Sequence, residues 1–411
     1  MEILFVTMVP FEYNSSATIQ NMGIIKGLVE LGCVIDILTL EPNPNYISYD
    51  SSMNDVGVLA RKTYFIQANS KYSILMAKKN MNLDEKLEFG KLREWFHILI
   101  SKSRPIIKGA FRAFSVYDAQ KINVKGVSRI RIDYSKYDII ISSSDPKSSH
   151  LIVERILKEN KDCKSKWIQY WGDPMLIDIT RNRSWNDAIV RFYENKIISQ
   201  AFRVVYVSPL TLMKQKEIYA KYSSKMDYAN QVYTNTKKNE ELPRIENFNY
   251  LSVGYIGSYR SDFRNILPLY NVANDSDFVL KVYGESDLVL ENSENVEINN
   301  SVPYHVALEV ESNSDILVCI CNRRGTQIPG KIYYIAGCNK PIIIILDGEY
   351  TNELRAFFEQ FERYILCNNN ELSIKESIET AKEEIRTRRV YEVKKQLTPI
   401  YLAKKLLNED L

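Results

Sequence analysis

The stretch Pro329-Gly-Lys-Ile-Tyr-Tyr-Ile-Ala-Gly-Cys-Asn-Lys-Pro341 is followed at once by Ile342-Ile-Ile-Ile-Leu346. Within its first part, Lys331–Ala336 carries apolar residues at helical spacing. The second part is apolar at every position, which is typical of a strand covered on both faces in a parallel sheet. A helix that leads into a fully buried strand is the repeating unit of a doubly wound α/β domain.

The same alternation extends in both directions from this stretch. Further segments with helical spacing are Thr18–Leu31, Ser148–Lys158 and Tyr304–Glu311. Continuous apolar runs predict strands at Ile3–Met8, Val34–Leu40, Tyr137–Ser142, Lys166–Trp171, Arg203–Ser208, Tyr250–Gly257, Phe278–Tyr283, Ile316–Asn322 and Tyr364–Cys367. The pattern predicts an α/β protein with two Rossmann-like, doubly wound domains.

A polar stretch separates the two sets of strands. Asn, Lys, Glu and Pro crowd between Ala229 and Phe248, and no long apolar run crosses that region. A chain of 411 residues is also too long for a single compact core. We therefore expect an N-terminal domain over 1–237, a linker over 238–248 and a C-terminal domain over 249–393.

Composition excludes several classes of protein. The net charge of +3 is too small to indicate nucleic acid as the main partner. The six cysteines lie mostly in apolar runs, so they predict buried thiols in a reducing compartment and no disulfide framework. The chain opens directly as a strand, without the pattern of a signal peptide, and no apolar run approaches the length of a membrane span. The expected location is the cytoplasm or the cytosolic face of a membrane.

One basic segment interrupts the α/β pattern, within an insertion at about 48–131. Between residues 61 and 137 there are 17 Lys or Arg and 6 Asp or Glu. Four aromatic residues are interleaved with the bases, namely Trp95, Phe96, Phe111 and Phe114. The segment could contact an anionic membrane surface as a peripheral element. It could equally be a solvated insertion whose apolar side packs on the domain.

Two places in the second half have the chemistry of an anion site. The first predicted strand there ends in Gly254-Tyr-Ile-Gly-Ser-Tyr-Arg260, and Ser261-Asp-Phe-Arg264 is expected to open a helix. Gly257 and Ser258 could then lie against a diphosphate, with Arg260 or Arg264 supplying positive charge. A surface role for Arg260 is as plausible.

Lys331 follows Pro329 in the first turn of the next predicted helix, where a cation opposes the helix dipole. A bound phosphate would compensate for that charge. The alternative is a lysine that points into solvent.

The segment Pro329–Pro341 resembles the "P-S-K-hydrophobic-x-E-Y-x-A-x-G-K-P" signature of the retaining GT-B glycosyltransferase superfamily (group 1, family 4-like). Other stretches of that pattern occur in the expected order. They are Tyr255-Ile-Gly-Ser with Arg264, Leu280-Lys-Val-Tyr-Gly284, Asn299-Asn-Ser-Val-Pro-Tyr304 and Ser314-Asp-Ile-Leu-Val. The N-terminal half agrees more loosely, at Tyr137-Asp-Ile-Ile-Ile-Ser-Ser-Ser-Asp-Pro146 and Gln169-Tyr-Trp-Gly-Asp-Pro174.

The resemblance implies a nucleotide-sugar donor, a UDP- or GDP-sugar, and no resident cofactor or metal. The residues expected around the donor are Gly257, Ser258, Arg260, Gly284, Val302, Ile328, Pro329, Gly330 and Tyr334, with Arg264, Lys331 and Asp173 in catalytic roles. The residues expected on the acceptor side are Ser15, Ser16, Asp145, His150 and Trp171. For His150, a polar cap at a helix start is the simpler interpretation. The segment 394–411 would be a helix that returns to the N-terminal domain.

The resemblance also implies the reaction, which is transfer of a sugar to a glycan or lipid-linked hydroxyl in cell-surface polysaccharide or glycoconjugate synthesis. The sequence departs from the pattern at two points. The acidic pair of the family would fall near Thr326 and at Tyr334, and its first-loop glycines are replaced by Ser15-Ser16-Ala17. A catalytically degenerate partner subunit and a nucleotide-sugar epimerase on the same fold therefore stay open. A nicotinamide dehydrogenase is disfavoured because no glycine-rich fingerprint follows Ile3–Met8.

Overall fold

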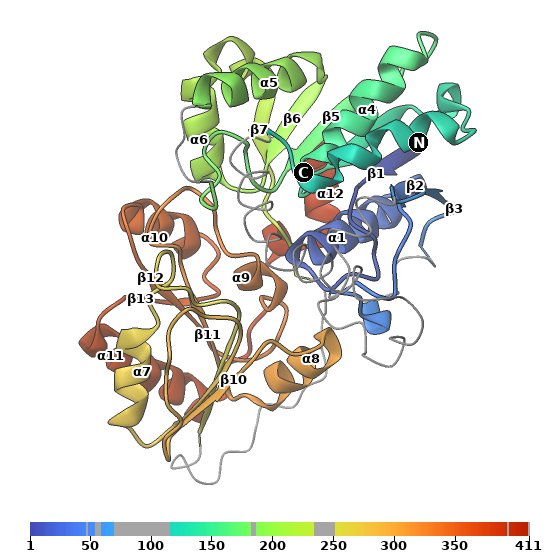
Figure 1. The fold of residues 1–411 in the computed structure, drawn as a ribbon. Helices are drawn as coiled ribbons and strands as arrows, with labels where there is room; N and C mark the ends of the chain where they lie inside the picture. Colours follow the sequence, from blue (N-terminus) through green and yellow to red (C-terminus); the bar gives the residue numbers. More distant parts are fainter. Residues whose placement is uncertain are drawn as a thin grey trace, which may run out of the picture. The chain divides into compact units, whose positions relative to one another are not determined.

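The computed structural model describes residues 1–46, 48–53, 59–69, 116–181, 186–233, 251–392 and 394–409. Contacts within the chain divide it into two compact units. Unit 1 comprises Met1–Tyr13, Val34–Tyr49 and Ala60–Val204, and unit 2 comprises Asn14–Cys33, Asp50–Leu59 and Val205–Leu411. Each unit is built around a parallel sheet with helices (Figure 1).

The first sheet has seven strands in the order β3-β2-β1-β4-β5-β6-β7. The strands are β1 (Glu2–Val6), β2 (Val34–Leu40), β3 (Lys62–Ile66), β4 (Ile139–Ser143), β5 (Lys166–Trp171), β6 (Arg203–Tyr206) and β7 (Met226–Tyr228). The pairings from β3 through β5 are parallel. The order in which strands are added to the sheet reverses at β1, which pairs in parallel with β2 on one side and with β4 on the other. A crevice beyond the carboxyl ends of the strands at such a switch point is the usual ligand site of a doubly wound sheet.

Helices and short 3₁₀ segments connect these strands. The helices are α1 (Ser16–Glu30), α4 (Ser148–Glu159), α5 (Asp187–Gln200) and α6 (Pro209–Ile218), and the 3₁₀ segments are η1 (Ser51–Met53), η4 (Ala119–Arg129), η5 (Tyr134–Lys136) and η6 (Ala220–Lys225). Capping residues fix where two of them begin. The Ser15 hydroxyl accepts from the Thr18 amide at the start of α1, and the Ser208 hydroxyl accepts from the Leu210 amide at the start of α6.

The second sheet has six strands, all paired in parallel, in the order β10-β9-β8-β11-β12-β13. The strands are β8 (Ser252–Ile256), β9 (Val279–Tyr283), β10 (Val296–Asn299), β11 (Ile316–Ile320), β12 (Ile342–Leu346) and β13 (Ile365–Asn368). Its helices are α7 (Leu267–Asn274), α8 (Tyr304–Asn313), α9 (Lys331–Tyr334), α10 (Thr351–Glu359) and α11 (Glu371–Arg386). This is the strand order 3-2-1-4-5-6 of a Rossmann domain, with the switch point at β8.

The final helix, α12 (Pro399–Leu407), packs against α1 within unit 2. A Cβ atom on Gly27 of α1 would lie 1.9 Å from the Pro399 carbonyl oxygen, so the two backbones approach too closely for any other residue there. Thr398 caps α12 through its hydroxyl, which accepts from the Tyr401 amide.

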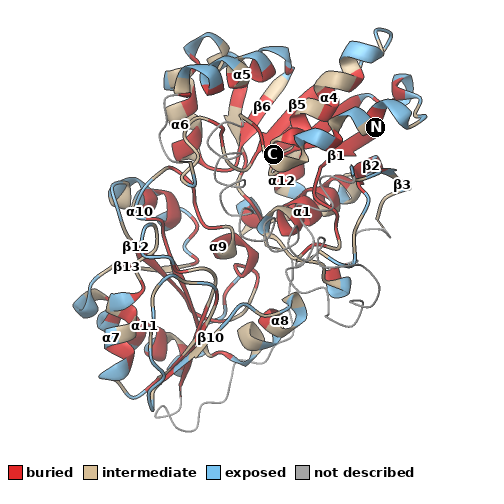
Figure 2. Cartoon of the chain, viewed as in Figure 1, coloured by how far each residue is buried: buried red, intermediate tan, exposed pale blue. Residues whose placement is uncertain are grey.

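The predicted α/β class and the two Rossmann-like sheets are confirmed. The central strands of both sheets are buried, as the continuous apolar runs indicated (Figure 2). Edge strands β3 and β10 were not predicted, because Lys62-Thr-Tyr-Phe-Ile66 and Val296-Glu-Ile-Asn299 are only partly buried and lack a continuous apolar run.

One predicted helix start is wrong. Ser261–Phe263 forms a turn, and α7 begins only at Leu267. The Asp287 carboxylate holds this turn by accepting from the Ser261 amide at 2.8 Å and from its hydroxyl at 2.6 Å. Arg264 therefore lies in the loop between β8 and α7.

Two other predictions fall on residues outside the described ranges. They are the linker at 238–248 and the aromatic residues of the basic segment, Trp95, Phe96, Phe111 and Phe114. The described parts of the insertion contain β3 and η4.

Candidate functional site

Two glycines lie at the switch point of the second sheet. Gly257 follows β8, and Gly284 follows the neighbouring strand β9. A Cβ atom on Gly284 would lie 2.1 Å from the Gly257 carbonyl oxygen. The glycine at 284 is thus required by the packing of the two strand ends.

Arg264 connects the loops that follow β8 and β11. Its Nη1 donates to the Ser258 carbonyl at 3.0 Å, and its Nε donates to Asn322 Oδ1 at 2.9 Å. Asn322 in turn donates from Nδ2 to the Gln327 carbonyl at 2.8 Å. The guanidinium is therefore held in place at the switch point before any ligand arrives. Arg260, by contrast, is 55% exposed at its side chain and lies 3.5 Å from Asp262.

Lys331 begins the four-residue helix α9, and its ammonium group forms an ion pair with Glu311 of α8. The turn that follows α9 is fixed by Arg363, whose side chain is buried. Its Nε donates to the Ala336 carbonyl at 2.9 Å and its Nη2 donates to the Lys340 carbonyl at 3.1 Å. Lys331 therefore begins a short helix whose following turn is held by Arg363, and Glu311 compensates the charge of the lysine.

Tyr334 is 8% exposed, and its hydroxyl donates to the Ser16 carbonyl at 2.9 Å. Gly330 lies under it, because a Cβ there would come within 2.6 Å of the Tyr334 hydroxyl. Ser15 caps α1, the helix that begins at Ser16. Both serines, which were predicted for the acceptor side, belong to unit 2.

Thr326, near the other position of the expected acidic pair, is also a neutral residue that forms hydrogen bonds. The Thr326 hydroxyl lies 3.0 Å from that of Thr211, and the Thr326 carbonyl accepts from Ser208.

The remaining donor-side predictions are spread around these groups. Ile328 and Pro329 are buried ahead of α9. Val302 is half-buried just ahead of α8, whose first amide, that of Tyr304, donates to the Asp50 carboxylate at 2.8 Å.

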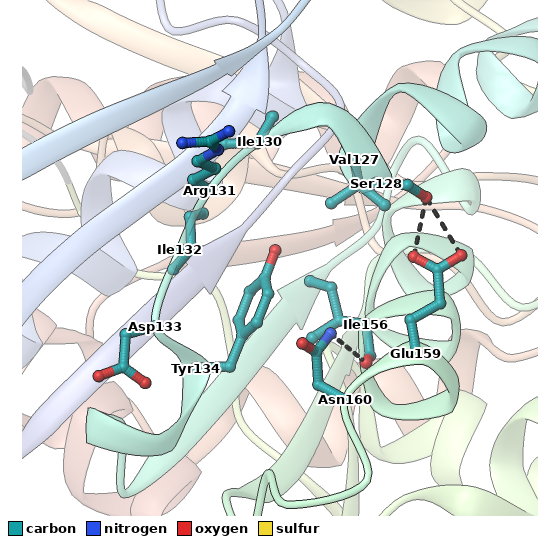
Figure 3. A pocket seen from close by; sticks show the side chains of 10 residues that line it. All are labelled: Val127, Ser128, Ile130, Arg131, Ile132, Asp133, Tyr134, Ile156, Glu159 and Asn160. Carbon is teal, nitrogen blue, oxygen red and sulfur yellow. Dashed lines mark hydrogen bonds between the residues drawn. The ribbon is translucent and has the colours of Figure 1, made fainter.

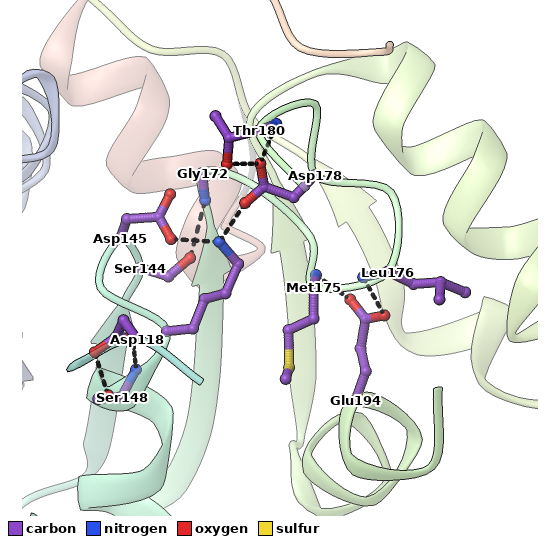
Figure 4. A network of polar contacts seen from close by, with 11 residues as sticks. Asp118, Ser144, Asp145, Ser148, Gly172, Met175, Leu176, Asp178, Thr180 and Glu194 are labelled. Carbon is purple, nitrogen blue, oxygen red and sulfur yellow. Dashed lines mark hydrogen bonds and ion pairs between the residues drawn. The ribbon is translucent and has the colours of Figure 1, made fainter. Parts of the chain in front are cut away.

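In unit 1, the carboxylates of Asp145 and Asp178 both pair with Lys147 beyond the ends of β4 and β5 (Figure 4). Lys147 Nζ lies 2.9 Å from Asp145 Oδ1 and 2.7 Å from Asp178 Oδ2. A third carboxyl, that of Asp173, lies close enough to Asp145 for the two groups to affect each other's pKa. The structure thus brings together Asp145 and Asp173, which the sequence had placed at two separate strand ends.

The protonation of this cluster is uneven. Burial and the adjacent Asp145 carboxyl raise the pKa of Asp173 well above its usual range. Burial also raises the pKa of Asp145, whereas Lys147 overcomes the effect of burial at Asp178 and holds the pKa of that carboxyl low. Because the two negative charges would repel each other, Asp145 and Asp173 do not ionise independently, and the pair keeps one proton until the pH exceeds the raised pKa of Asp173.

A buried glutamate fixes the loop that carries Asp173 and Asp178. Glu194 of α5 is fully buried and accepts from the Met175 amide at 2.7 Å and from the Leu176 amide at 3.1 Å (Figure 4). The Gly172 amide also donates to Ser144 Oγ at 3.2 Å, which ties the two strand ends together.

His150 is fully buried and does not cap the helix, so the predicted polar cap is wrong. Its Nδ1 lies 2.7 Å from Ser142 Oγ, and its ring lies against Trp171 with centroids 4.1 Å apart. Burial lowers the pKa of His150 to about 3, so the ring is neutral. Trp171 is itself buried and donates to Gln169 Oε1 at 3.0 Å. Both rings are therefore packed in the interior of unit 1.

The described residues contain no group of three or more His, Cys, Asp or Glu side chains that could hold a metal ion. Among the described helices, none is long and apolar enough to cross a membrane.

Sequence reasoning missed the residues that act through others, namely Asn322, Glu311, Lys147, Asp178 and Glu194. Lys147 could have been found, because it follows the strand-end pair Asp145-Pro146 directly. Glu194 and Asn322 carry no local signal, since their partners are distant in sequence.

No protein-family model and no curated protein sequence matches the chain. Solved structures do match along nearly its whole length. Sucrose-phosphate synthase from Thermosynechococcus elongatus is 12% identical with a TM-score of 0.55, covering 99% of this chain and 94% of its own. A glycosyltransferase from Rickettsia africae is 13% identical with a TM-score of 0.53, covering 99% and 93%. An alpha-glucosyltransferase in complex with UDP and DNA is 10% identical with a TM-score of 0.50, covering 98% and 95%.

Similarity at this level of identity establishes fold. The two Rossmann-like sheets and the match to solved structures over nearly the whole chain point to the same fold. They confirm the fold implied by the Pro329–Pro341 pattern. The chain has the GT-B fold.

Proposed function

We propose that the protein is a glycosyltransferase that moves a sugar from a nucleotide-sugar donor to an acceptor hydroxyl. The donor binds at the carboxyl end of the second sheet and the acceptor at the carboxyl end of the first. The fold supports this proposal, because the similar structures include a sucrose-phosphate synthase and an alpha-glucosyltransferase in complex with UDP.

The observation that carries the proposal is the fixed position of Arg264. Its guanidinium is held by the Ser258 carbonyl and by Asn322, at a switch point where Gly257 has no side chain and, among the described residues, no non-neighbouring atom closer to its Cβ position than Arg264 Nη1, at 4.0 Å. A guanidinium held in this way loses little freedom when it binds a phosphate, and its planar fork suits a diphosphate.

The chemistry follows from the charge that develops on the leaving group. As the bond from the sugar to the diphosphate breaks, negative charge grows on the diphosphate oxygens, and fixed cations stabilise it. Arg264 supplies one cation in place. Lys331 supplies a second when its ammonium group turns from Glu311 toward the diphosphate.

Asp145 and Asp173 act on the acceptor. One ionised oxygen of the pair accepts a hydrogen bond from the attacking hydroxyl, which aligns it for transfer. Lys147 holds Asp145 in position at 2.9 Å. Transfer is proposed to retain the anomeric configuration and to need no metal, so activity should persist in a strong chelator. Loss of turnover that magnesium or manganese restores would contradict the metal-independent mechanism.

The donor class is a UDP- or GDP-sugar, and the acceptor is a glycan or a lipid-linked sugar of cell-surface polysaccharide or glycoconjugate synthesis. The protein would then work in the cytoplasm, on the cytosolic membrane face. The surplus of 11 positive charges between residues 61 and 137 supports contact with anionic lipid. Vesicle flotation should recover the protein with anionic lipid and not with neutral lipid.

Thermal shift against a panel of nucleotide sugars tests the donor assignment. A ligand that binds only the native state raises stability by mass action, by about 2.7 kcal/mol at a hundred times its dissociation constant. One nucleotide family should raise the melting temperature at millimolar concentration, and the free sugars should not. An unchanged melting temperature with every nucleotide sugar would contradict the assignment.

A second candidate is a degenerate partner subunit that lacks turnover. The observation that favours it is Tyr334, whose hydroxyl is engaged by the Ser16 carbonyl at the position where the resembling family has a carboxylate. Tyr334→Glu separates the two candidates. In a working transferase the substitution should tighten donor binding, because a charged contact is stronger than a neutral one. In a degenerate subunit it should only bury an unpaired charge and lower the melting temperature.

A further inference from the structure

A cavity lies at the far end of α4 from the carboxyl cluster (Figure 3). Its volume is about 490 Å³, within the range of about 300–1,000 Å³ typical of small-molecule sites. It is lined by the end of η4, the following segment 130–134 and the last turn of α4. Because η5 precedes β4 and α4 follows it, this cavity lies at the amino end of β4, opposite the proposed acceptor site.

The lining of the cavity is mixed, with aliphatic side chains beside polar and charged ones, and the side chain of the buried Tyr134 points into it. Val127, Ile130, Ile132 and Ile156 surround the ring of Tyr134. Tyr134 is only 6% exposed, and its hydroxyl has no hydrogen-bond partner among the residues that the structure describes. The hydroxyl is directed toward the space between the isoleucine side chains (Figure 3). Burial raises its pKa to about 12, so it is a neutral group ready to donate.

The charges around the cavity leave one cation available. Glu159 is occupied, because it accepts from Ser128 Oγ at 2.8 Å and pairs with Arg155 at 2.7 Å.

Asp133 is occupied as well, by the Ser135 amide at 3.0 Å and the Ser135 hydroxyl at 2.6 Å. Arg131 is exposed, and within the described ranges it makes no hydrogen bond or ion pair. The free charge at this cavity is therefore positive.

We propose that this cavity is a second binding site, distinct from the donor and acceptor sites, for a small amphipathic anion. Its apolar ring or chain fills the space between Val127, Ile132 and Ile156, its polar atom pairs with the Tyr134 hydroxyl, and its carboxylate, sulfonate or phosphate pairs with Arg131. The proposal does not depend on the proposed transferase activity.

The test uses 8-anilinonaphthalene-1-sulfonate, an aromatic anion whose fluorescence rises in apolar sites, with the full-length protein. One site should be titrated, and saturating UDP or GDP should not displace the dye. Arg131→Ala should weaken binding about tenfold, and Tyr134→Phe about threefold, the ranges for a charged and a neutral hydrogen bond. Arg129→Ala is the matched control, since it removes the same charge from an exposed position that does not line the cavity.

Two further probes make the result decisive. N-phenyl-1-naphthylamine has the same rings without the sulfonate, so it should bind more weakly and be insensitive to Arg131→Ala. Ile132→Trp should fill the cavity and abolish binding of both dyes while the melting temperature is kept. The proposal would be overturned if Arg129→Ala weakened binding as much as Arg131→Ala, if the nucleotide displaced the dye, or if both dyes bound equally.

Discussion

The second sheet ends in glycines and in an arginine held by two hydrogen bonds, whereas the first ends in two carboxylates paired with one lysine and in a third carboxyl, that of Asp173. Both sets of residues occupy the carboxyl ends of parallel strands close to a switch point, so topology gives the two ends the same opportunity to bind a ligand. Their side chains give them opposite chemistry. The cationic end suits a diphosphate, and the carboxyl end suits a hydroxyl that must be oriented and relieved of a proton.

The comparison also shows how differently the two ends are supported. Arg264 is held by a backbone carbonyl and by Asn322, both neutral partners that leave its charge uncompensated. Asp145 and Asp178 are held by Lys147, which cancels part of their charge. The second sheet therefore offers a positive charge to an anion, whereas the first sheet keeps one carboxyl protonated, which lowers the negative charge of its cluster.

The largest expected effect is on the free energy of unfolding. It should separate Asp36, a buried structural carboxylate, from Asp145, the carboxylate proposed to act on the acceptor. Asp36 of β2 is fully buried and accepts from Tyr137 at 2.6 Å, Lys136 at 2.8 Å and Arg61 at 2.9 Å. Asp36→Asn should lower the free energy of unfolding by about 3 kcal/mol, as expected when one partner of a buried ion pair is lost. Asp145→Asn should change it by less than about 1 kcal/mol, because the Asp145 side chain is only partly buried, at 36% exposed, and Lys147 keeps its ion pair with Asp178. Urea unfolding of both variants measures the difference.

The two carboxyls should also give opposite pH dependence. Although burial opposes it, hydrogen bonds from Arg61, Lys136 and Tyr137 hold the pKa of Asp36 far below its usual value, so its contribution is full above about pH 4 and is lost as pH falls. The raised pKa of Asp173 means that the native state binds that proton more tightly than the unfolded state. Stability should therefore fall as pH rises from about 4 toward the raised pKa, and Asp173→Asn should remove this slope. A slope unchanged in Asp173→Asn would contradict the shared proton.

The next effect concerns turnover. Asp145→Asn should lower kcat about a hundredfold, at the low end for a group that handles a proton in the transition state. Donor affinity should stay within about twofold, because Asp145 lies at the other sheet. Asp133→Asn is a matched control for a carboxylate in the same unit that faces neither proposed substrate. An equal loss in both variants would remove the acceptor role of Asp145.

The smallest expected effect is on nucleotide affinity at the second sheet, where Lys331 pairs with Glu311. Glu311→Gln removes the partner charge of Lys331, so the ammonium group is freer to turn to a diphosphate. Affinity for a nucleoside diphosphate should rise about two- to threefold, a few tenths of a kcal/mol, as for a partly exposed ion pair. Glu309→Gln, on the same helix, should leave the affinity unchanged.

Patterns of apolar residues were enough to predict most of the fold. The runs at Val34–Leu40 and Lys166–Trp171 match β2 and β5 in full, because fully buried strands leave an unbroken signal in the sequence. The edge strands β3 and β10 were missed, because partly buried edges have no such signal. The helix expected at 261–264 was wrong because a distant carboxylate, Asp287, holds that segment as a turn.

The candidate site was predictable where its residues follow a strand, as for Gly257, Asp145 and Asp173. It was not predictable where a side chain acts through a partner far along the chain. Glu194 holds an amide 19 residues away, and Tyr334 reaches a carbonyl 318 residues away. Likewise, helical spacing marked His150 as a helix start but could not show that its ring is buried against Trp171. Such contacts depend on tertiary packing, which local patterns do not specify.

The most direct test of the account measures how Arg264 responds to the second phosphate of a nucleotide. Affinities of the nucleoside diphosphate and monophosphate, with whichever of uracil or guanine binds better, are measured by calorimetry for the native protein and for Arg264→Ala. The native protein should prefer the diphosphate, and Arg264→Ala should lose about 30-fold in diphosphate affinity, about 2 kcal/mol, and much less for the monophosphate. Arg324→Ala, an exposed arginine paired with Asp262, should behave as the native protein. Equal losses for both nucleotides, or native diphosphate affinity in Arg264→Ala, would contradict the claim that the second sheet ends in a diphosphate site.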